Sequence, residues 1–223
     1  MRFVTATSLF DGHDAAINIV RRVLQDAGAE VIHLGHNRSV EEVVEAAVQE
    51  DVQGVAVTSY QGGHILFFKY LVDLLRRKGM GHIRVFGGGG GTILPWEIKE
   101  LQEYGVARIF SPEDGRMMGF AGMIDWMLEQ ADFDVLECGR FDAAAAAAGD
   151  PAAVARALSA VEQGRAGEIL GALREASPGE PMVPVVGVTG TGGAGKSSVV
   201  DELVNRFLRH DPEARAAVLG IDP

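Results

Sequence analysis

The sequence predicts an α/β fold in which helices cover both faces of a parallel sheet. Within the first 130 residues, short runs of apolar and β-branched residues alternate five times with longer stretches of helical periodicity. The short runs contain few polar residues, as expected of strands that are buried on both faces. This alternation favours a flavodoxin-like, five-stranded parallel sheet with the strand order 2-1-3-4-5.

The strands and helices of this sheet can be placed in order along the chain. The predicted strands are residues 3–7, 30–34, 54–59, 83–86 and 108–110. The helices that follow them are predicted to end at Gly28, near Gln49, at Gly79, at Gly105 and near Gln130. Ser39 and Glu42 have the spacing of a capping box, and Pro95 suits a first helical turn. Residues 1–130 are therefore predicted to form one domain.

A change of pattern separates this domain from the rest of the chain. Residues 131–182 are predicted to be a linker that contains the alanine run 143–148 and becomes helical after Asp150 and Pro151, with one or two helices over 151–177. An apolar strand is expected over Val183–Val188, and residues 221–223 are expected to end a second strand. Residues 183–223 are therefore predicted to begin a second α/β domain.

Composition and charge exclude several classes of protein. The 223 residues are 47% apolar and 23% charged, which is typical of a globular chain. The formal net charge of −11 and the lack of a basic run longer than residues 76–78 argue against nucleic acid and anionic membranes as partners. Cys138 is the single cysteine, and neither a signal peptide nor a membrane-spanning stretch is recognisable. We therefore expect a cytoplasmic protein.

Three unusual stretches follow the predicted strands one, three and four. They are Asp11-Gly12-His13, residues 59–63 and residues 87–91. The carboxyl ends of parallel strands meet at one edge of the sheet, where ligands bind at the switch point between strands one and three. Each stretch alone has a simpler explanation, with His13 and Ser59 as helix caps and the glycines as turns. Together they predict one continuous pocket.

The residue types in these stretches favour a large, flat ligand. Five successive glycines destabilise a loop that only has to turn, but they let a bulky ligand lie against the backbone. One histidine is too few for an all-protein metal site, yet it suffices as an axial ligand when a macrocycle holds the metal. Asp11 can accept a hydrogen bond from the other ring nitrogen of His13 and so fix its tautomer.

A second motif predicts a nucleotide site. Residues 190–197 match G-x-x-x-x-G-K-[ST], in which backbone N–H groups surround phosphates, Lys196 reaches the terminal phosphates and Ser197 coordinates magnesium. The apolar run before it and the helical pattern after it favour this motif over the alternative, a chance glycine-rich turn. The predicted nucleotide-binding residues are Gly190, Gly192, Gly193, Ala194, Gly195, Lys196, Ser197 and Ser198.

Residues 11–16, Ser59 and residues 87–91 resemble the DxHxxG…SxL…GG pattern of cobalamin-binding domains in acyl-CoA mutases and methionine synthase. The resemblance implies that His13 is the lower axial ligand of cobalt, and that Ser59 hydrogen-bonds the displaced dimethylbenzimidazole tail, buried beside the first strand. Ala16 replaces the second glycine of the pattern, and Gln61 replaces its leucine. The implied cofactor-binding residues are Asp11, Gly12, His13, Asp14, Ser59, Gln61, Gly63, Gly87, Gly88, Gly89 and Gly90.

The order of the two motifs along the chain points to a smaller group of proteins. A cobalamin motif followed by a phosphate loop is similar to the start of the fused isobutyryl-CoA mutases, a family that joins an adenosylcobalamin domain, a GTPase chaperone and an acyl-CoA barrel. The resemblance implies adenosylcobalamin and GTP with magnesium as cofactors, a radical rearrangement of isobutyryl-CoA to n-butyryl-CoA, an acyl-CoA substrate held by a domain outside these residues, and a homodimer. Since that barrel and much of the nucleotide domain are absent, we expect residues 1–223 alone to be inactive.

Two other classes can be compared with this one. A cobalamin carrier or sensor, with a nucleotide-gated loading domain and no mutase activity, accounts for the same residues. A phosphoacceptor receiver domain shares the five-stranded fold, but it requires paired acids after strand one, an aspartate after strand three and a lysine after strand five. The sequence has Leu9-Phe10-Asp11, Ser59-Tyr60 and Ser111-Pro112 there, which disfavours the receiver class.

Overall fold

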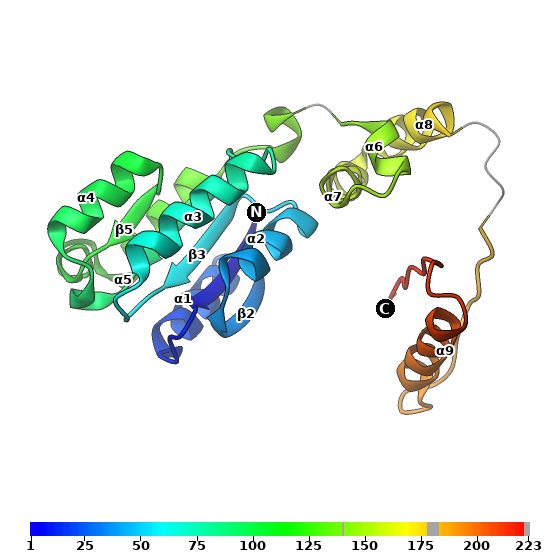
Figure 1. Cartoon of the computed structure of the whole chain (residues 1–223), viewed down its shortest axis with the longest axis horizontal. Helices are drawn as coiled ribbons and strands as arrows, with labels where there is room; N and C mark the ends of the chain where they lie inside the picture. The colour runs from blue at the N-terminus through cyan, green and yellow to red at the C-terminus, as the bar shows by residue number, and fades with distance from the viewer. Residues whose placement is uncertain (140, 178–182, 221–223) are drawn as a thin grey trace. The chain divides into compact units, whose positions relative to one another are not determined.

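The structure, a computed structural model, describes residues 1–139, 141–177 and 183–220, which belong to two compact units, 1–178 and 179–223 (Figure 1). The strands are β1 (Arg2–Ser8), β2 (Glu30–Arg38), β3 (Gly54–Thr58), β4 (Arg84–Gly88) and β5 (Arg108–Phe110). The helices are α1 (Ala15–Asp26), α2 (Val40–Gln49), α3 (His64–Arg77), η1 (Gly90–Thr92), α4 (Pro95–Tyr104), α5 (Pro112–Ala131), η2 (Val135–Cys138), α6 (Ala143–Ala147), α7 (Pro151–Ala160), η3 (Val161–Arg165), α8 (Ala166–Ala176) and α9 (Lys196–His210).

The five strands form one parallel sheet in the order β2-β1-β3-β4-β5, which confirms the predicted flavodoxin-like topology. Helices follow the strands in alternation, as the sequence pattern predicts. The chain leaves β1 toward β2 on one side and returns to β3 on the other, so the loops after β1 and β3 diverge at the carboxyl edge. This is the position at which sheets of this kind bind ligands.

Local signals explain most of the boundaries. The capping box is confirmed, because Ser39 Oγ accepts from the Glu42 N–H and the Glu42 carboxylate accepts from the Ser39 N–H. Gly105 follows α4 with a φ of 127°, a conformation that side chains disfavour. β2 continues beyond its predicted end at Leu34 because pairing with β1 resumes after an irregular register around Gly35.

Helices cover both faces of the sheet (Figure 1), and each face has its own hydrophobic core. Helices α2, α3 and α4 bury residues such as Val44, Phe68 and Leu101 against one face. Helices α1 and α5 cover the other face around Phe3 and Phe86. Helix α5 is broken at Gly119, whose φ of 68° and ψ of 173° are not helical. The second half of α5 therefore has its own direction, and a pocket lies between it and α1.

The predicted helices over residues 151–177 are confirmed as α7 and α8, and the alanine run forms the short helix α6. These helices pack within the same compact unit as the sheet. Arg156 of α7 donates to Asp51 Oδ1 from Nη2 at 2.8 Å and from Nε at 3.1 Å, and also to the carbonyl of Val135. Both charged side chains are buried, so this ion pair attaches α7 to the end of α2.

The predicted strand over Val183–Val188 is wrong for the described residues, which form no strand there. Val185 is 93% exposed. A strand is stabilised by hydrogen bonds to a neighbour and by burial of its side chains, and the described part of this unit contains no second strand. The strand end expected at residues 221–223 lies outside the described residues.

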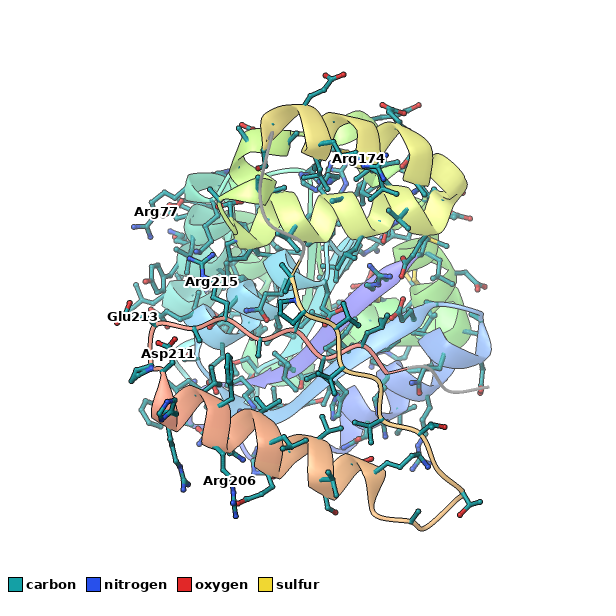
Figure 2. The ribbon with its side chains drawn as sticks, turned by 90° about the vertical axis from the view of Figure 1, so that its right-hand side faces the viewer. Arg77, Arg174, Arg206, Asp211, Glu213 and Arg215 are labelled. Carbon is teal, nitrogen blue, oxygen red and sulfur yellow. The ribbon has the colours of Figure 1, made fainter. Side chains whose placement is uncertain are left out.

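The second unit is described through the loop at residues 190–195 and α9. The predicted helix after that loop is confirmed as α9. Its charged face lies in solvent, where Arg206, labelled in Figure 2, has its Nε 2.6 Å from Glu202 Oε1. Throughout residues 1–139, 141–177 and 183–220, no helix combines the length and apolarity that crossing a membrane requires.

Candidate functional site

His13 and Asp11 form an oriented pair in the loop after β1. Asp11 is buried, and its Oδ1 accepts from the His13 backbone N–H at 2.9 Å and lies 2.7 Å from His13 Nδ1. The other carboxylate oxygen, Oδ2, accepts from the Tyr60 N–H. The His13 side chain itself is 77% exposed. The contact fixes Nδ1 toward Asp11, which leaves Nε2 on the opposite side of the exposed ring.

His13 does not cap the helix that follows it. Helix α1 begins at Ala15, and Asp14 is its N-cap residue, without a side-chain cap hydrogen bond. The His13 ring centroid lies 5.7 Å from that of Tyr60, which comes from the loop after β3. The exposed imidazole is thus held by a buried acid and flanked by an aromatic ring, an arrangement that favours a ligand role over capping.

The electrostatics of Asp11 depend on its hydrogen bonds. Burial by itself would raise its pKa, but the backbone N–H groups of Tyr60 and His13, together with the imidazole, hold the pKa of Asp11 below its ordinary value. The carboxylate therefore stays ionised at neutral pH and can keep Nδ1 of His13 protonated.

Acid is expected to weaken the fold through Asp11. Because the folded-state pKa is lowered, the stabilisation is complete above the unfolded pKa of about 3.9 and is lost as pH falls through the folded value. Urea unfolding at about pH 6 and about pH 3 should show a larger loss of unfolding free energy for the wild type than for Asp11→Asn. Equal losses in the two proteins would contradict this assignment.

Gln61, in the loop after β3, and His64, the first residue of α3, hold the loops of the site together. Gln61 Nε2 donates to the Leu9 carbonyl at 2.9 Å, and its Oε1 accepts from the Gly63 N–H at 3.1 Å. His64 is buried, with Nδ1 3.0 Å from the Gln61 carbonyl and Nε2 3.0 Å from Glu97 Oε2. Gln61 therefore joins the loops after β1 and β3, and His64 joins the latter to α4.

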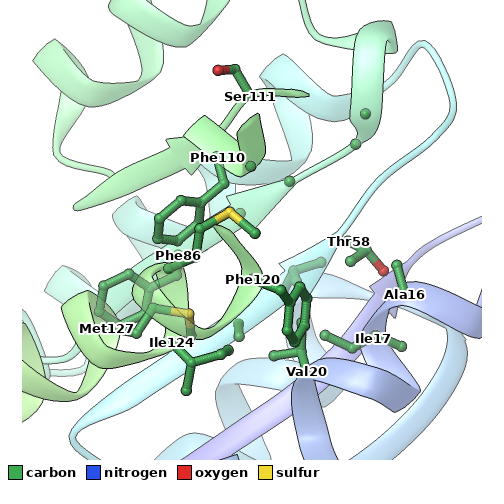
Figure 3. A pocket seen from close by; sticks show the side chains of 18 of the residues that line it. Ala16, Ile17, Val20, Thr58, Phe86, Phe110, Ser111, Phe120, Ile124 and Met127 are labelled. Carbon is green, nitrogen blue, oxygen red and sulfur yellow. The ribbon is translucent and has the colours of Figure 1, made fainter. Parts of the chain in front are cut away.

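A pocket of about 340 Å³ lies between α1 and α5, at the carboxyl ends of β3, β4 and β5 (Figure 3). Its walls are mostly apolar, which suits an aromatic ligand group. The lining residues are Ala16, Ile17, Val20, Ala56, Val57, Thr58, Tyr60, Phe86, Gly87, Gly88, Gly89, Gly90, Phe110, Ser111, Pro112, Gly115, Phe120, Met123, Ile124 and Met127.

The glycines at the end of β4 and directly after it differ in what a side chain there would meet. A Cβ on Gly87 would come within 2.5 Å of Phe68 and Ile109, and one on Gly89 would overlap the carbonyl of Ser59, so these two are required by internal packing. A Cβ on Gly88 would meet only an ordinary contact, at 3.6 Å. The protein therefore has room for a side chain at position 88. Because glycine has none, that space stays open in the pocket.

Hydroxyl groups at the end of β3 point to opposite sides of the sheet, since side chains alternate along a strand. Ser59 is fully buried and its Oγ accepts from Ser8 Oγ at 2.8 Å, and it does not line the pocket. Thr58 does line it, and Figure 3 shows its hydroxyl beside Ala16. Of the two hydroxyls, that of Thr58 belongs to the pocket lining and also lies 3.2 Å from Thr7 Oγ1, and the role of Ser59 toward a cofactor tail stays a prediction.

The remaining predicted cofactor residues lie on the same edge but outside the pocket. Asp11, Gly12, His13 and Asp14 form the loop between β1 and α1, and Gln61 and Gly63 belong to the loop before α3. Sequence reasoning missed the wall built by β5 and α5, with Phe110, Phe120, Met123 and Met127. These apolar residues belong to no recognisable sequence motif, and their spacing alone predicts only that they are buried in the hydrophobic core.

The phosphate loop has the backbone expected of its motif. Gly193 and Gly195 adopt φ values of 74° and 81°, and Gly195 directly precedes α9. Lys196 Nζ donates to the carbonyls of Gly190 and Thr191 at 2.8 and 3.0 Å, so the lysine lies across the loop. The N–H groups at the start of α9 are suited to phosphate. Among the described residues, no three acidic, histidine or cysteine side chains gather as a metal site.

An exposed imidazole that a buried acid orients at the switch point, beside an apolar pocket, is typical of an α/β domain that binds a ligand at this edge. Comparison with known families agrees, because residues 1–121 match the B12 binding domain. The chain belongs to the B12-binding domain family. Residues 154–223 match a second model, "Methylmalonyl Co-A mutase-associated GTPase MeaB". The second match begins within α7, which packs on the sheet domain.

Curated relatives extend over the whole chain. It is 58% identical, over 100% of its length, to fused isobutyryl-CoA mutases from Geobacillus kaustophilus and Cupriavidus metallidurans, of which it covers 21% and 20%. The chain thus spans about a fifth of the length of these relatives. It is also 39% identical over 40% of its length to the 2-hydroxyisobutanoyl-CoA mutase small subunit of Aquincola tertiaricarbonis, covering 65% of that protein.

Proposed function

We propose that this chain binds adenosylcobalamin, with His13 as the lower axial ligand of cobalt and the benzimidazole tail in the pocket between α1 and α5. The observation that carries the proposal is the pairing of His13 Nδ1 with buried Asp11, 2.7 Å away, beside a 340 Å³ apolar pocket. The residues present fit the group, because Gly88 leaves open a space that a Cβ would fill.

Different residues of the chain would bind different parts of the cofactor. Asp11 keeps the imidazole in the tautomer that presents Nε2, and Gln61 holds the loop in place. Thr58 offers the pocket a hydroxyl, and Phe120 and Met127 supply apolar walls. When bound, the cofactor supplies an organic radical for carbon-skeleton rearrangement, and the protein orients it.

The proposed reaction is the interconversion of isobutyryl-CoA and n-butyryl-CoA by the whole protein, a homodimer, with the acyl-CoA bound outside residues 1–223. Relatives that are 55–58% identical over the full chain carry this mutase name, which favours it over a cobalamin carrier or sensor. Residues 190–198 would bind GTP, with Ser197 on magnesium, since residues 154–223 match a mutase-associated GTPase.

Electron paramagnetic resonance of cob(II)alamin bound to the ¹⁵N-labelled chain tests the axial ligand. Free cobalamin carries its own ¹⁴N base, which splits each cobalt line into a triplet. If His13 replaces that base, the labelled nitrogen should split each line into a doublet. A triplet in the bound state would show that the tail stays on cobalt, and the proposal would then be wrong.

Filling the pocket is expected to weaken cobalamin binding. Gly88→Leu should raise the dissociation constant about tenfold or more, because the added side chain occupies the space left for the tail. Gly167→Leu, on α8, is the matched control: a Cβ there meets nothing within 4 Å and Gly167 does not line the pocket. Titration followed by the visible spectrum measures both, and equal affinities in the two variants would contradict the assignment of the pocket.

A further inference from the structure

Phe10 is a bulky residue at the third position of a turn that the Asp11 N–H closes by donating to the Ser8 carbonyl at 3.1 Å. Its φ is 64°, in the left-handed region that bulky residues avoid. Its side chain is 83% exposed, so the ring does not pack in the core. Strained residues persist where the surrounding structure holds them, and they cluster at ligand sites. The turn accounts for the left-handed backbone, but it would favour a small residue there, so the exposed aromatic ring needs an explanation outside the fold itself.

The loop that carries Phe10 is held from two sides. Asn37, at the end of β2, accepts from the Phe10 N–H through Oδ1 at 2.8 Å, and its own N–H donates to the Asp11 carbonyl at 3.2 Å. Asn37 itself has a φ of 58°, which asparagine tolerates better than most residues. From the β3 side, Gln61 holds the Leu9 carbonyl. The same contacts that fix Asp11 and His13 thus also fix Phe10.

We propose that Phe10 contacts the corrin ring of the bound cofactor, with Asn37 as the positioning residue that holds it ready. This inference rests on the cobalamin binding proposed above. Phe10 and His13 are three residues apart, a span of at most about 11 Å, so a macrocycle centred on the His13 ligand position reaches both. Phe10 does not line the tail pocket, so the proposal assigns it to the corrin ring and not to the tail. A preset aromatic ring binds without losing further conformational freedom.

Cobinamide, which has the corrin ring but lacks the benzimidazole tail, separates this contact from the tail pocket. Phe10→Asn removes the ring and keeps a residue that tolerates the left-handed conformation. We expect it to weaken both cobalamin and cobinamide about tenfold. Gly88→Leu should weaken cobalamin alone. A Phe10→Asn effect limited to cobalamin would place the contact on the tail and overturn the inference.

Thermal unfolding of the ligand-free chain gives a second, independent readout. Since Phe10 is exposed and strained, Phe10→Asn should not lower the melting temperature, whereas a residue needed for packing would. Leu158→Ala, at an exposed leucine of α7, is the control and should change neither affinity. Unchanged affinity for both corrinoids in Phe10→Asn, or a lowered melting temperature, would refute the role of Phe10.

Two substitutions at Asn37 test its positioning role. Asn37→Asp keeps an oxygen acceptor for the Phe10 N–H and should retain the wild-type affinity for cobinamide. Asn37→Gly keeps the backbone conformation but removes the acceptor, and should lose as much affinity as Phe10→Asn. Equal affinity in the two variants would remove Asn37 from the proposal. If the wild-type chain binds neither corrinoid, the proposed function itself fails, and the wild-type titration reports this separately.

Discussion

His13→Ala is expected to weaken cobalamin binding about a hundredfold or more and to abolish the ¹⁵N doublet of bound cob(II)alamin. The expectation follows from the site, in which the His13 side chain is 77% exposed and its Nδ1 is fixed by a buried carboxylate. Alanine has no nitrogen to place beneath cobalt. Any cobalamin that still binds should keep its own base, so each line should be a ¹⁴N triplet.

Two further variants separate ligation from general effects on the fold. His36→Ala removes an exposed histidine from the end of β2 and should leave affinity and splitting unchanged. Asp11→Asn keeps one of the two acceptor oxygens used by the backbone and loses the charge that orients the imidazole, so an affinity loss of about 10- to 100-fold is expected. Wild-type affinity and an unaltered doublet in His13→Ala would show that another nitrogen binds cobalt.

Arg156→Met is expected to lower the unfolding free energy of the first unit by about 3–5 kcal/mol. The substitution leaves Asp51 buried and charged without its guanidinium partner. Asp51 cannot turn to water easily, because it is held at a φ of 46° at the end of α2, and its Oδ2 already has no hydrogen-bond partner among the described residues. Urea unfolding of the variant and the wild type measures the difference.

The double variant Asp51→Asn/Arg156→Met tests whether the loss comes from the unpaired charge. Asparagine is neutral and tolerates the left-handed conformation, so the double variant should be more stable than Arg156→Met alone.

A nearby histidine, His82, gives a second readout of the same substitution. Burial, and to a lesser extent the charge of Arg156, lower the pKa of His82, which should therefore rise in Arg156→Met when followed by NMR. An unchanged unfolding free energy in the single variant would contradict the expected cost.

The Asp51–Arg156 ion pair also connects the helices after residue 150 to the sheet domain. The sequence pattern predicts a linker over residues 131–182, because the strand–helix alternation stops there. In the structure α7 instead contacts α2, with Arg156 reaching an aspartate 105 positions earlier in the chain. A contact between residues so distant leaves no local signal, so the pattern cannot reveal it.

The sequence by itself determined the sheet and its order, the start of α2 after Ser39, the end of α4 at Gly105, and both ligand motifs. Each of these features depends on patterns of residues a few positions apart. Only the tertiary structure decided that Thr58 rather than Ser59 lines the pocket, and that α5 supplies much of its wall. The alternation of side chains at the end of β3 and the break in α5 at Gly119 set those directions, and which face carries the pocket depends on how the helices pack. The exposed residues 183–188 show the converse, since an apolar pattern becomes a strand only beside a partner.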